Sequence, residues 1–446
     1  MIPDVRGLSV TSEAPLAVAA LDDAVASLLA HRADLPEHLA RALGADPGLV
    51  PARVLAGLGL LVQARAPLHP QALAHLASAR ASLRERGGTP REAALVGALA
   101  SWAEDGDMDA AATHLEGVLR AAPHDAMALK LAHAIRFMLG DAVAMRLAVE
   151  TALPAWDAGT PGHGYILGCH AFALEETGDG AAAELSGRAA LTIAPDDLWG
   201  AHAVAHVMEG EGRARQGLAW IEALHPRLAA GGSFGRHLHW HAALFHLHLG
   251  DGEAALALFD RRIGAAPCDD VRDFANAASL LWRLEAQGIA AGARRWDALA
   301  RIAAEAAGQP GLAFIDLHHV LALGAAGRRR ELDTKLEAMR LRTLTQADSQ
   351  ARVLATIGLP VARGIAAALR DDPAEAVALL LPLRGRMRAL GGSDAQRDLF
   401  DRILIDAALR SGRRAVVAML LRDRLGRRAF GAWEARCTAM PRALAA

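Results

Sequence analysis

Cysteine, aromatic residues and any excess of one charge are all scarce in this chain of 446 residues. Its three cysteines, Cys169, Cys268 and Cys437, are too few and too scattered for a disulfide framework or a CxxC metal site, which predicts a reducing compartment. The 48 basic and 50 acidic side chains nearly cancel, so the chain lacks the positive field that gathers nucleic acid. We find neither a basic leader followed by an apolar stretch nor an apolar run of membrane-spanning length. We therefore expect a soluble, cytoplasmic protein that binds neither nucleic acid nor membrane.

What the chain does contain favours helices. Alanine and leucine dominate, β-branched runs are short, and aromatic residues make up only 4% of the sequence. Alanine and leucine are strong helix formers, whereas strands are enriched in β-branched and aromatic residues. The composition therefore predicts an all-α protein.

Glycine-aspartate pairs recur every 72 residues, and a proline follows each glycine at a fixed offset. The repeated positions are Gly106, Gly178 and Gly250 with Pro123, Pro195 and Pro267. Gly140 and Gly212 divide each period into units of 34 and 38 residues. A period near 34 is the length of a tetratricopeptide (TPR) helix-turn-helix unit. We therefore predict a TPR-like α-solenoid in which antiparallel helix pairs stack into one superhelix.

The repeat region is predicted to span residues 51–446, with the clearest repeats in 91–267, after an N-terminal helical cap or arm over residues 1–50. Small residues stand at one packing position of three successive units, namely Ala111, Ala183 and Ala255. The large aromatic residue of the TPR consensus is replaced by Leu95, Leu167 and His239 in the same units. The repeats are therefore degenerate.

Histidine is the chief chemical signal. The chain has 19 histidines, and eight of them lie between residues 202 and 248. On one predicted helix His202, His206 and Glu209 share a narrow face, because they are four and then three residues apart. On the next long helix His237, His241 and His248 share a face for the same reason. In the TPR register Trp199, His202, His206 and Glu209 take the positions that line the concave groove of such proteins.

Three interpretations of these histidines remain open. The imidazoles could pack between helices, each satisfied by a neighbouring polar group. They could bind a divalent metal such as zinc, with His202, His206, Glu209 and His241 as ligands. They could instead line a small-molecule pocket, where imidazole and carboxylate groups provide hydrogen bonds or acid-base chemistry; the candidate catalytic residues are then again His202, His206, Glu209 and His241.

A second, weaker signal lies near the C-terminus. Ser393 followed three residues later by Gln396 is a capping-box pattern and predicts the start of a helix. Arg397, just inside this helix, could bind an anion near the helix N-terminus, although a surface ion pair is commoner.

Several strings together resemble the tetratricopeptide repeat protein 38 family. The strings, in order, are Lys130 to His133, His202 to Val207 with Glu209, His237, Trp240 to Leu244, Asp316 with His318, and Leu380 to Phe400 including Gly391 to Asp398. The resemblance covers about residues 125 to 415 and implies a cytosolic, degenerate TPR-like solenoid without a particular activity. Among the histidines and acids above, it implies that His202, His206, Glu209, His237, His241 and His318 occupy motif positions of the family.

Our leading hypothesis is a soluble TPR-like binding protein with a His/Glu-rich pocket on its concave face, which recognises a small polar molecule or a peptide end. Its predicted ligand-binding residues are Trp199, His202, His206, Glu209, His237, His241, His318 and Arg397. The first alternative is an enzyme of hydrolase or lyase type, metal-dependent or not, that uses the same cluster. The second is a protein-protein interaction scaffold. The sequence leaves the oligomeric state open.

Overall fold

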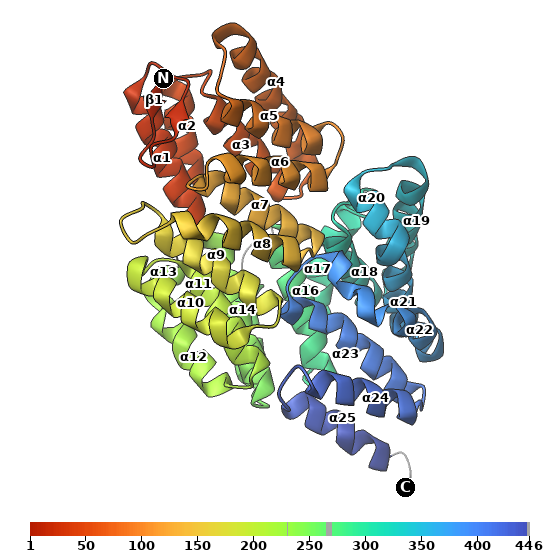
Figure 1. The fold of residues 1–446 in the computed structure, drawn as a ribbon. Coiled ribbons are helices and arrows are strands. Elements are labelled where there is room, and N and C mark those ends of the chain that lie inside the picture. The colour runs from red at the N-terminus through yellow and green to blue at the C-terminus, as the bar shows by residue number, and fades with distance from the viewer. Residues whose placement is uncertain (230, 265–269, 444–446) are drawn as a thin grey trace. The chain divides into compact units, whose positions relative to one another are not determined.

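The computed structural model describes residues 1–229, 231–264 and 270–443, and these are almost entirely helical (Figure 1). The prediction of an all-α protein is confirmed. The repeat proline Pro267 and Cys268 lie outside the described residues. The strands in the described part are two short ones near the N-terminus, β1 (Ile2–Pro3) and β2 (Ser9–Val10), which pair antiparallel with Ile2 opposite Val10.

The chain divides into two compact units, which we describe separately. Unit 1 consists of Met1–Val204 and Arg227–Phe234, and unit 2 of Ala205–Pro226 and Gly235–Ala446. Three helices contain a boundary between the units: α11 (Leu198–Gly210), α13 (His225–Leu228) and α14 (Gly232–His248). The predicted boundary at residue 50 stays a prediction.

Unit 1 is built from short helices joined by tight turns. They are α1 (Pro15–Ala30), α2 (Leu35–Ala45), α3 (Val50–Val62), η1 (Ala66–Leu68), α4 (His69–Arg86), α5 (Pro90–Ala103), α6 (Met108–Ala121), α7 (Ala126–Leu139), α8 (Ala142–Ala152), η2 (Leu153–Ala155), α9 (His163–Glu176) and α10 (Gly180–Ile193). Successive helices pack on each other as pairs, for example α1 with α2, α3 with α4, α5 with α6, and α9 with α10. This arrangement is like that of a helical repeat.

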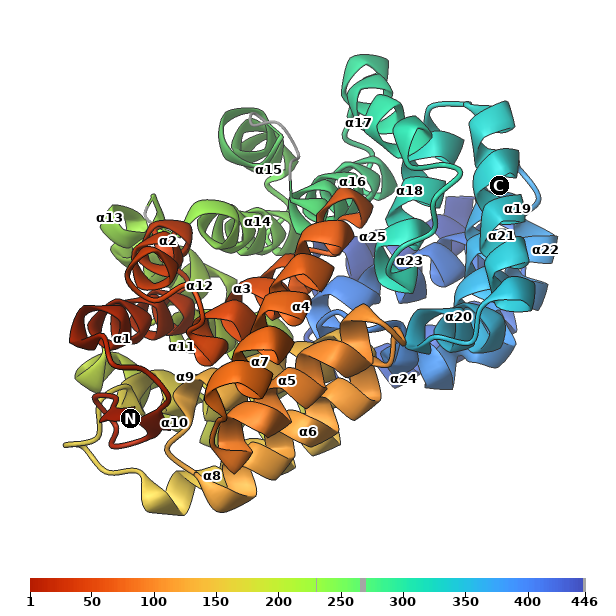
Figure 2. The ribbon, with the colours of Figure 1, turned by 90° about the horizontal axis from the view of Figure 1, so that it is seen from above.

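Unit 2 continues the same kind of structure. Its helices are α12 (Ala214–Ala223), α15 (Gly252–Leu258), η3 (Phe259–Ile263), α16 (Val271–Ala286), α17 (Ala293–Glu305), α18 (Ala313–Ala325), α19 (Arg329–Thr345), α20 (Ser349–Val353), η4 (Leu354–Gly358), α21 (Leu359–Leu369), α22 (Pro373–Leu380), η5 (Leu381–Leu390), α23 (Asp394–Arg410), α24 (Arg414–Leu425) and α25 (Ala432–Ala443). Figure 2 shows α18, α19 and α21 running side by side. One apolar core extends through unit 2 from Trp240 to Cys437.

The repeated glycine-aspartate pairs form turns between helices. Gly140 ends α7 in the left-handed conformation, with φ at 70°, which glycine adopts without steric cost. Asp141 then caps α8, because its carboxylate accepts a hydrogen bond from the Ala144 amide at 3.0 Å. The other glycines of the pattern, Gly106, Gly178 and Gly250, also have positive φ, and Asp107, Asp179 and Asp251 cap α6, α10 and α15. The predicted turns are confirmed.

The capping box at the start of α23 is confirmed as well. The Ser393 side chain accepts a hydrogen bond from the Gln396 amide at 3.3 Å, and the Gln396 side chain accepts one from the Ser393 amide at 3.0 Å. This box fixes the start of α23 directly after the glycine pair Gly391-Gly392. It thereby sets where Asp394, Arg397 and Asp398 lie.

One expectation about membranes was wrong. The continuous helical run Ser349–Leu369, which comprises α20, η4 and α21, has 21 residues and is apolar enough to span a membrane by length and composition. However, 61% of its apolar window is buried inside the protein, as in a core helix. The run opens with the polar residues Ser349, Gln350 and Arg352.

Candidate functional site

Three histidines of unit 2 meet between α11 and α14. His206 lies on α11, while His237 and His241 lie one turn apart on α14. The ring centroids of His206 and His241 are 4.6 Å apart, and those of His237 and His241 are 4.8 Å apart. His206 and His241 are buried, and His237 is partly exposed. Within unit 2 these two helices thus bring His206 close to His241 and His237.

Hydrogen bonds fix the orientation of these rings. The Nδ1 of His237 lies 3.2 Å from the Oδ1 of Asn276, a buried residue of α16. Because Oδ1 can only accept, Nδ1 of His237 carries the proton and its Nε2 carries a lone pair. The Nε2 of His241 lies 3.2 Å from this Nε2. Trp240 stacks on His237 with 5.3 Å between the ring centroids and limits the freedom of that ring.

Burial keeps these imidazoles neutral. It lowers the pKa of His237 to about 3, and the neighbouring His206 adds to the effect. Burial likewise places the pKa of His241 well below its usual value, again with contributions from His206 and His237. Neutral imidazoles with lone pairs can accept a hydrogen bond or bind a metal, and near neutral pH they are poor sources of a proton.

Glu209, which shares the α11 face of His206, is held by an arginine that the sequence reading did not single out. Arg428, which follows α24, donates two hydrogen bonds to Glu209, at 2.7 and 2.6 Å, and one to Asp394 at 2.8 Å. Burial opposes ionisation of Glu209, but the charge and hydrogen bonds of Arg428 outweigh it and keep the pKa of Glu209 below its usual value. Glu209 is therefore an ionised carboxylate that accepts two hydrogen bonds from Arg428.

Further buried charges extend this network along α23, α24 and α25. Asp398 accepts hydrogen bonds from Arg402 at 2.6 Å and from Arg424, and Arg424 also donates to Glu434 at 2.7 Å. Arg283 of α16 lies 3.8 Å from Asp398 and donates to the Ala395 carbonyl at 2.9 Å. Each buried charge here thus has an opposite partner, as burial of charge requires.

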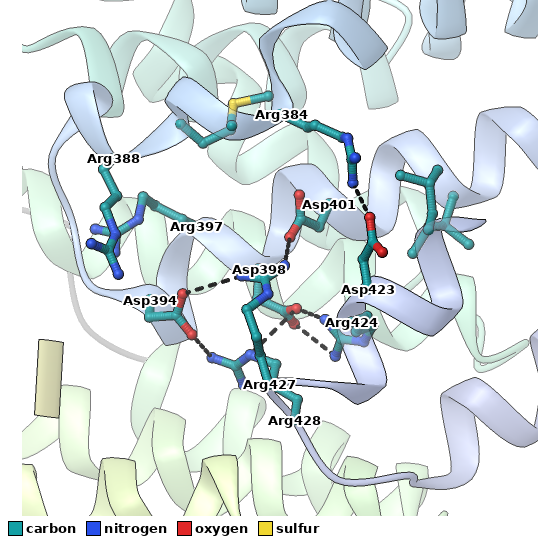
Figure 3. A pocket seen from close by; sticks show the side chains of 14 residues that line it. Arg384, Arg388, Asp394, Arg397, Asp398, Asp401, Asp423, Arg424, Arg427 and Arg428 are labelled. Carbon is teal, nitrogen blue, oxygen red and sulfur yellow. Dashed lines mark hydrogen bonds and ion pairs between the residues drawn. The ribbon is translucent and has the colours of Figure 1, made fainter. Parts of the chain in front are cut away.

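A pocket of about 390 Å³ opens beside this network. Its walls come from η5, α23 and α24 and from the residues that follow α24 (Figure 3). Six arginines and four aspartates provide most of the lining: Arg384, Arg388, Arg397, Arg424, Arg427, Arg428, Asp394, Asp398, Asp401 and Asp423. Met387, Ile405 and Leu420 supply apolar contacts.

The arginines of this pocket differ in their burial and in their hydrogen-bond and ion-pair partners. Arg424 and Arg428 are buried in ion pairs, and Arg427 reaches Asp401 at 3.3 Å. Arg397 is buried and donates to the Gly392 carbonyl. Arg388 is exposed, and within the described residues its guanidinium has no hydrogen-bond or ion-pair partner. In Figure 3 the side chains of Arg388 and Arg397 lie at the same side of the view. Arg397, for which we predicted anion binding, thus lines this pocket.

The predicted residues Trp199 and His202 belong to unit 1. The indole of Trp199 donates to Nε2 of the buried His133 at 3.2 Å, and Lys130 lies over its ring at 4.7 Å. His202 stacks on Phe172 with 5.4 Å between ring centroids. These contacts place Trp199 and His202 in an aromatic and imidazole cluster of unit 1.

His318 occupies a different environment from the three histidines of unit 2. Its Nδ1 donates to the Phe314 carbonyl at 2.8 Å, and its ring packs against Phe400 at 5.8 Å between centroids. Burial lowers the pKa of His318 to about 3. Its neighbour in the predicted motif, Asp316, forms a buried ion pair with Lys335 at 2.5 Å. These contacts are those of packed core residues.

Sequence reasoning missed most of the arginines and aspartates that meet Glu209 and Asp398. Arg283, Arg424 and Arg428 pair with residues of other helices, whereas Arg402 pairs with Asp398 one turn earlier in α23. The local signal that could have found this site is the string Gly391 to Asp398, which contains the capping box and Arg397. This string forms one wall of the pocket.

A comparison with protein-family models finds none that matches the chain.

Proposed function

We propose that this protein binds a small anion, one that carries carboxylate or phosphate groups, in the arginine pocket of unit 2. The observation that carries the proposal is the lining of that pocket, in which six arginines face four aspartates. The proposal narrows the sequence hypothesis of a small polar molecule or a peptide end, because a peptide C-terminus is itself a carboxylate.

The positive excess of the pocket persists when its neighbours are included. Arg283 and Arg402 add two positive charges next to the lining, while Glu209 and Glu434 add two negative ones. The surplus of two arginines over the acids therefore remains. The exposed guanidinium of Arg388 lines this pocket, and it is the group that we assign to the ligand, with the buried Arg397 beside it in the lining.

Arginine suits such a ligand. Its planar guanidinium presents parallel N–H donors that match the two oxygens of a carboxylate or a phosphate. The surrounding ion pairs hold the other arginines rigid, so that a ligand does not have to order them. The volume of about 390 Å³ lies at the small end of the range for small-molecule pockets.

The enzyme alternative uses His206, Glu209 and His241 for acid-base chemistry. Both hydrogen bonds from Arg428 stabilise the ionised form of Glu209, which makes this carboxylate a weak base. Binding is therefore the function that the contacts support better. A protein-docking scaffold remains the other alternative, and the charged pocket favours a small ligand over it.

We further propose that the helix pairs stack as a TPR-like solenoid, and that the chain belongs to the tetratricopeptide repeat protein 38 family and is cytoplasmic. The supports are the 72-residue period, the helix pairs of each unit, and the strings that resemble that family.

Thermal unfolding in the presence of candidate anions tests the binding proposal. Citrate, inorganic phosphate and a short peptide with a free C-terminus are compared at constant ionic strength, with sodium chloride as the reference and the amidated peptide as the matched control. At about 100 times its dissociation constant a ligand adds about 2.7 kcal/mol of stability, so the midpoint should rise by several degrees.

The pattern of response identifies the ligand chemistry. A rise with phosphate alone assigns a phosphoryl group, and a rise with citrate or only with the free-ended peptide assigns a carboxylate. If every midpoint equals that in sodium chloride, the proposed function is wrong.

A further inference from the structure

The three histidines of unit 2 have the spacing of metal ligands. One ring nitrogen from each of His206, His237 and His241 can be chosen so that these atoms lie within 4.8 Å of one another. The Nε2 atoms of His237 and His241 are 3.2 Å apart. Two nitrogens bound tetrahedrally to zinc at 2.0–2.1 Å would be separated by about 3.3 Å. These two imidazoles therefore stand at about the separation that one tetrahedral ion requires, and the proton that Nε2 of His241 donates to His237 would move to Nδ1 of His241 when an ion binds.

The tautomer of His237 also matches that of a ligand. Because Nδ1 of His237 donates to Asn276, its Nε2 lone pair points away from Asn276 and towards His241. A metal-bound histidine usually donates its other ring N–H to a fixed acceptor, which orients the ring and raises its basicity. Asn276 is buried on α16 and fills that position.

The helices supply a rigid frame. His237 and His241 are four residues apart on α14, a spacing that places two imidazoles on one helix face. His206 comes from α11, so that the ligands span two elements. His237 is the partly exposed member of the three.

The neighbouring charges are compatible with a cation. Arg428 is matched by Glu209 and Asp394, and Arg283 lies beside Asp398, so each nearby guanidinium has a carboxylate partner. Neutral nitrogen ligands are typical of zinc and of related divalent transition metals.

From these observations we propose that His206, His237 and His241 bind one divalent transition-metal ion of the zinc type, with Asn276 as the residue that positions His237. Three protein nitrogens leave a further coordination position, as in zinc sites that bind water or a ligand. This inference is independent of the anion pocket, because it concerns different residues and a different ion.

Zinc titration of protein purified without a histidine tag tests the inference. The protein is treated with a chelator, returned to buffer and titrated with zinc against a chromophoric competitor. We expect one zinc ion per chain, and a visible absorption band typical of tetrahedral coordination when cobalt replaces zinc. His237→Gln and His241→Ala should each abolish stoichiometric binding, and Asn276→Ala should weaken it about 10- to 100-fold.

Two controls separate metal binding from folding and from anion binding. His239→Gln changes a partly exposed histidine between the two ligands on α14 and should bind zinc like the wild type. Arg388→Gln should do the same, because Arg388 lines only the anion pocket. Should His241→Ala fail to fold, the half-buried His237→Gln variant decides the matter. Absence of stoichiometric binding in the wild type, or unchanged affinity in His237→Gln, overturns the inference.

Discussion

Charged and imidazole side chains in this protein are buried together with partners that fix their ionisation. Asp316 and Lys335 illustrate the pattern, since both are almost fully buried and their charged atoms are 2.5 Å apart. Burial opposes ionisation of Asp316, but Lys335 and His319 outweigh it and lower its pKa. A carboxyl group with a lowered folded pKa stabilises the protein above its unfolded pKa and loses that contribution as the pH falls.

Removing one member of this pair should therefore cost more than removing both. Asp316→Asn leaves the buried ammonium of Lys335 without its counter-charge and should lower the free energy of unfolding by about 3–5 kcal/mol. The double variant Asp316→Asn/Lys335→Met removes both charges and should be clearly more stable than the single variant. Urea unfolding of the four proteins of this cycle measures the difference. If the loss of stability in the double variant equalled the sum of the losses in the two single variants, the pair would not be coupled.

The pKa of Asp197, in unit 1, is shifted in the opposite direction to that of Asp316. Burial raises the pKa of Asp197 to about 7, although Lys130 and the backbone amides of Gly200 and Trp199 oppose the shift. A carboxyl group with a raised folded pKa binds its proton more tightly in the folded state. Its effect on stability is then absent below the unfolded pKa, and stability falls as the pH rises from there to the folded pKa.

We expect this group to leave a measurable slope in the pH dependence of stability. Between about pH 4 and pH 7 the wild type should lose up to about 4 kcal/mol through Asp197, since one pKa unit corresponds to about 1.4 kcal/mol. Asp197→Asn keeps an oxygen to cap α11 but cannot ionise, and should lack this slope. Urea midpoints across the pH range measure it, with the exposed Asp105→Asn as control. A slope unchanged by Asp197→Asn would refute the assignment.

At the scale of elements, the glycine-aspartate turn sets where each helix pair bends. Gly178 has φ at 91° and open space where a Cβ would lie, so its role is conformational and not steric. Gly59, inside α3, also has open space there but lies in a regular helix. The two positions thus differ in backbone conformation but not in the space available for a Cβ.

Alanine should have opposite effects at these two positions. Gly178→Ala should destabilise the protein by about 1–2 kcal/mol, because the left-handed conformation is unfavourable once a Cβ is present. Gly59→Ala should stabilise it by about 0.5–1 kcal/mol, since alanine is the better helix former. Thermal or urea unfolding of both variants provides the comparison. If Gly178→Ala were as stable as the wild type, the turn would not need glycine.

Local elements were largely predictable from the sequence, because their signals are local. The Gly140-Asp141 turn and the Ser393 capping box each depend on residues a few positions apart. The ion pairs that join distant parts of the chain were not predictable in this way. Glu209 and Arg428 are 219 residues apart in the chain, and nothing near either residue specifies the other. The histidine spacing of α14 was readable, whereas the support of His237 by Asn276 depends on how α16 packs.

At the scale of the whole molecule, a net charge of −2 conceals a local surplus of positive charge. The pocket beside α23 gathers six arginines, and the neighbouring acids do not cancel them. A net charge near zero gives no general attraction for polyanions on charge alone, whereas a pocket of this kind can still select a small anion. The net charge of the whole chain therefore does not predict the charge of this pocket.

Isothermal titration of the protein with citrate and with inorganic phosphate tests the proposed anion pocket most directly, when the wild type is compared with two arginine variants. Arg388→Gln removes an exposed guanidinium that lines the pocket, and Arg386→Gln removes an exposed one from the same segment, η5, that does not. We predict that at least one of these anions binds saturably to a single site. The affinity should be about tenfold lower in Arg388→Gln, because a charged hydrogen bond contributes about 1.5 kcal/mol or more. The affinity should be unchanged in Arg386→Gln. Absence of binding, or equal affinities in all three proteins, would contradict the account.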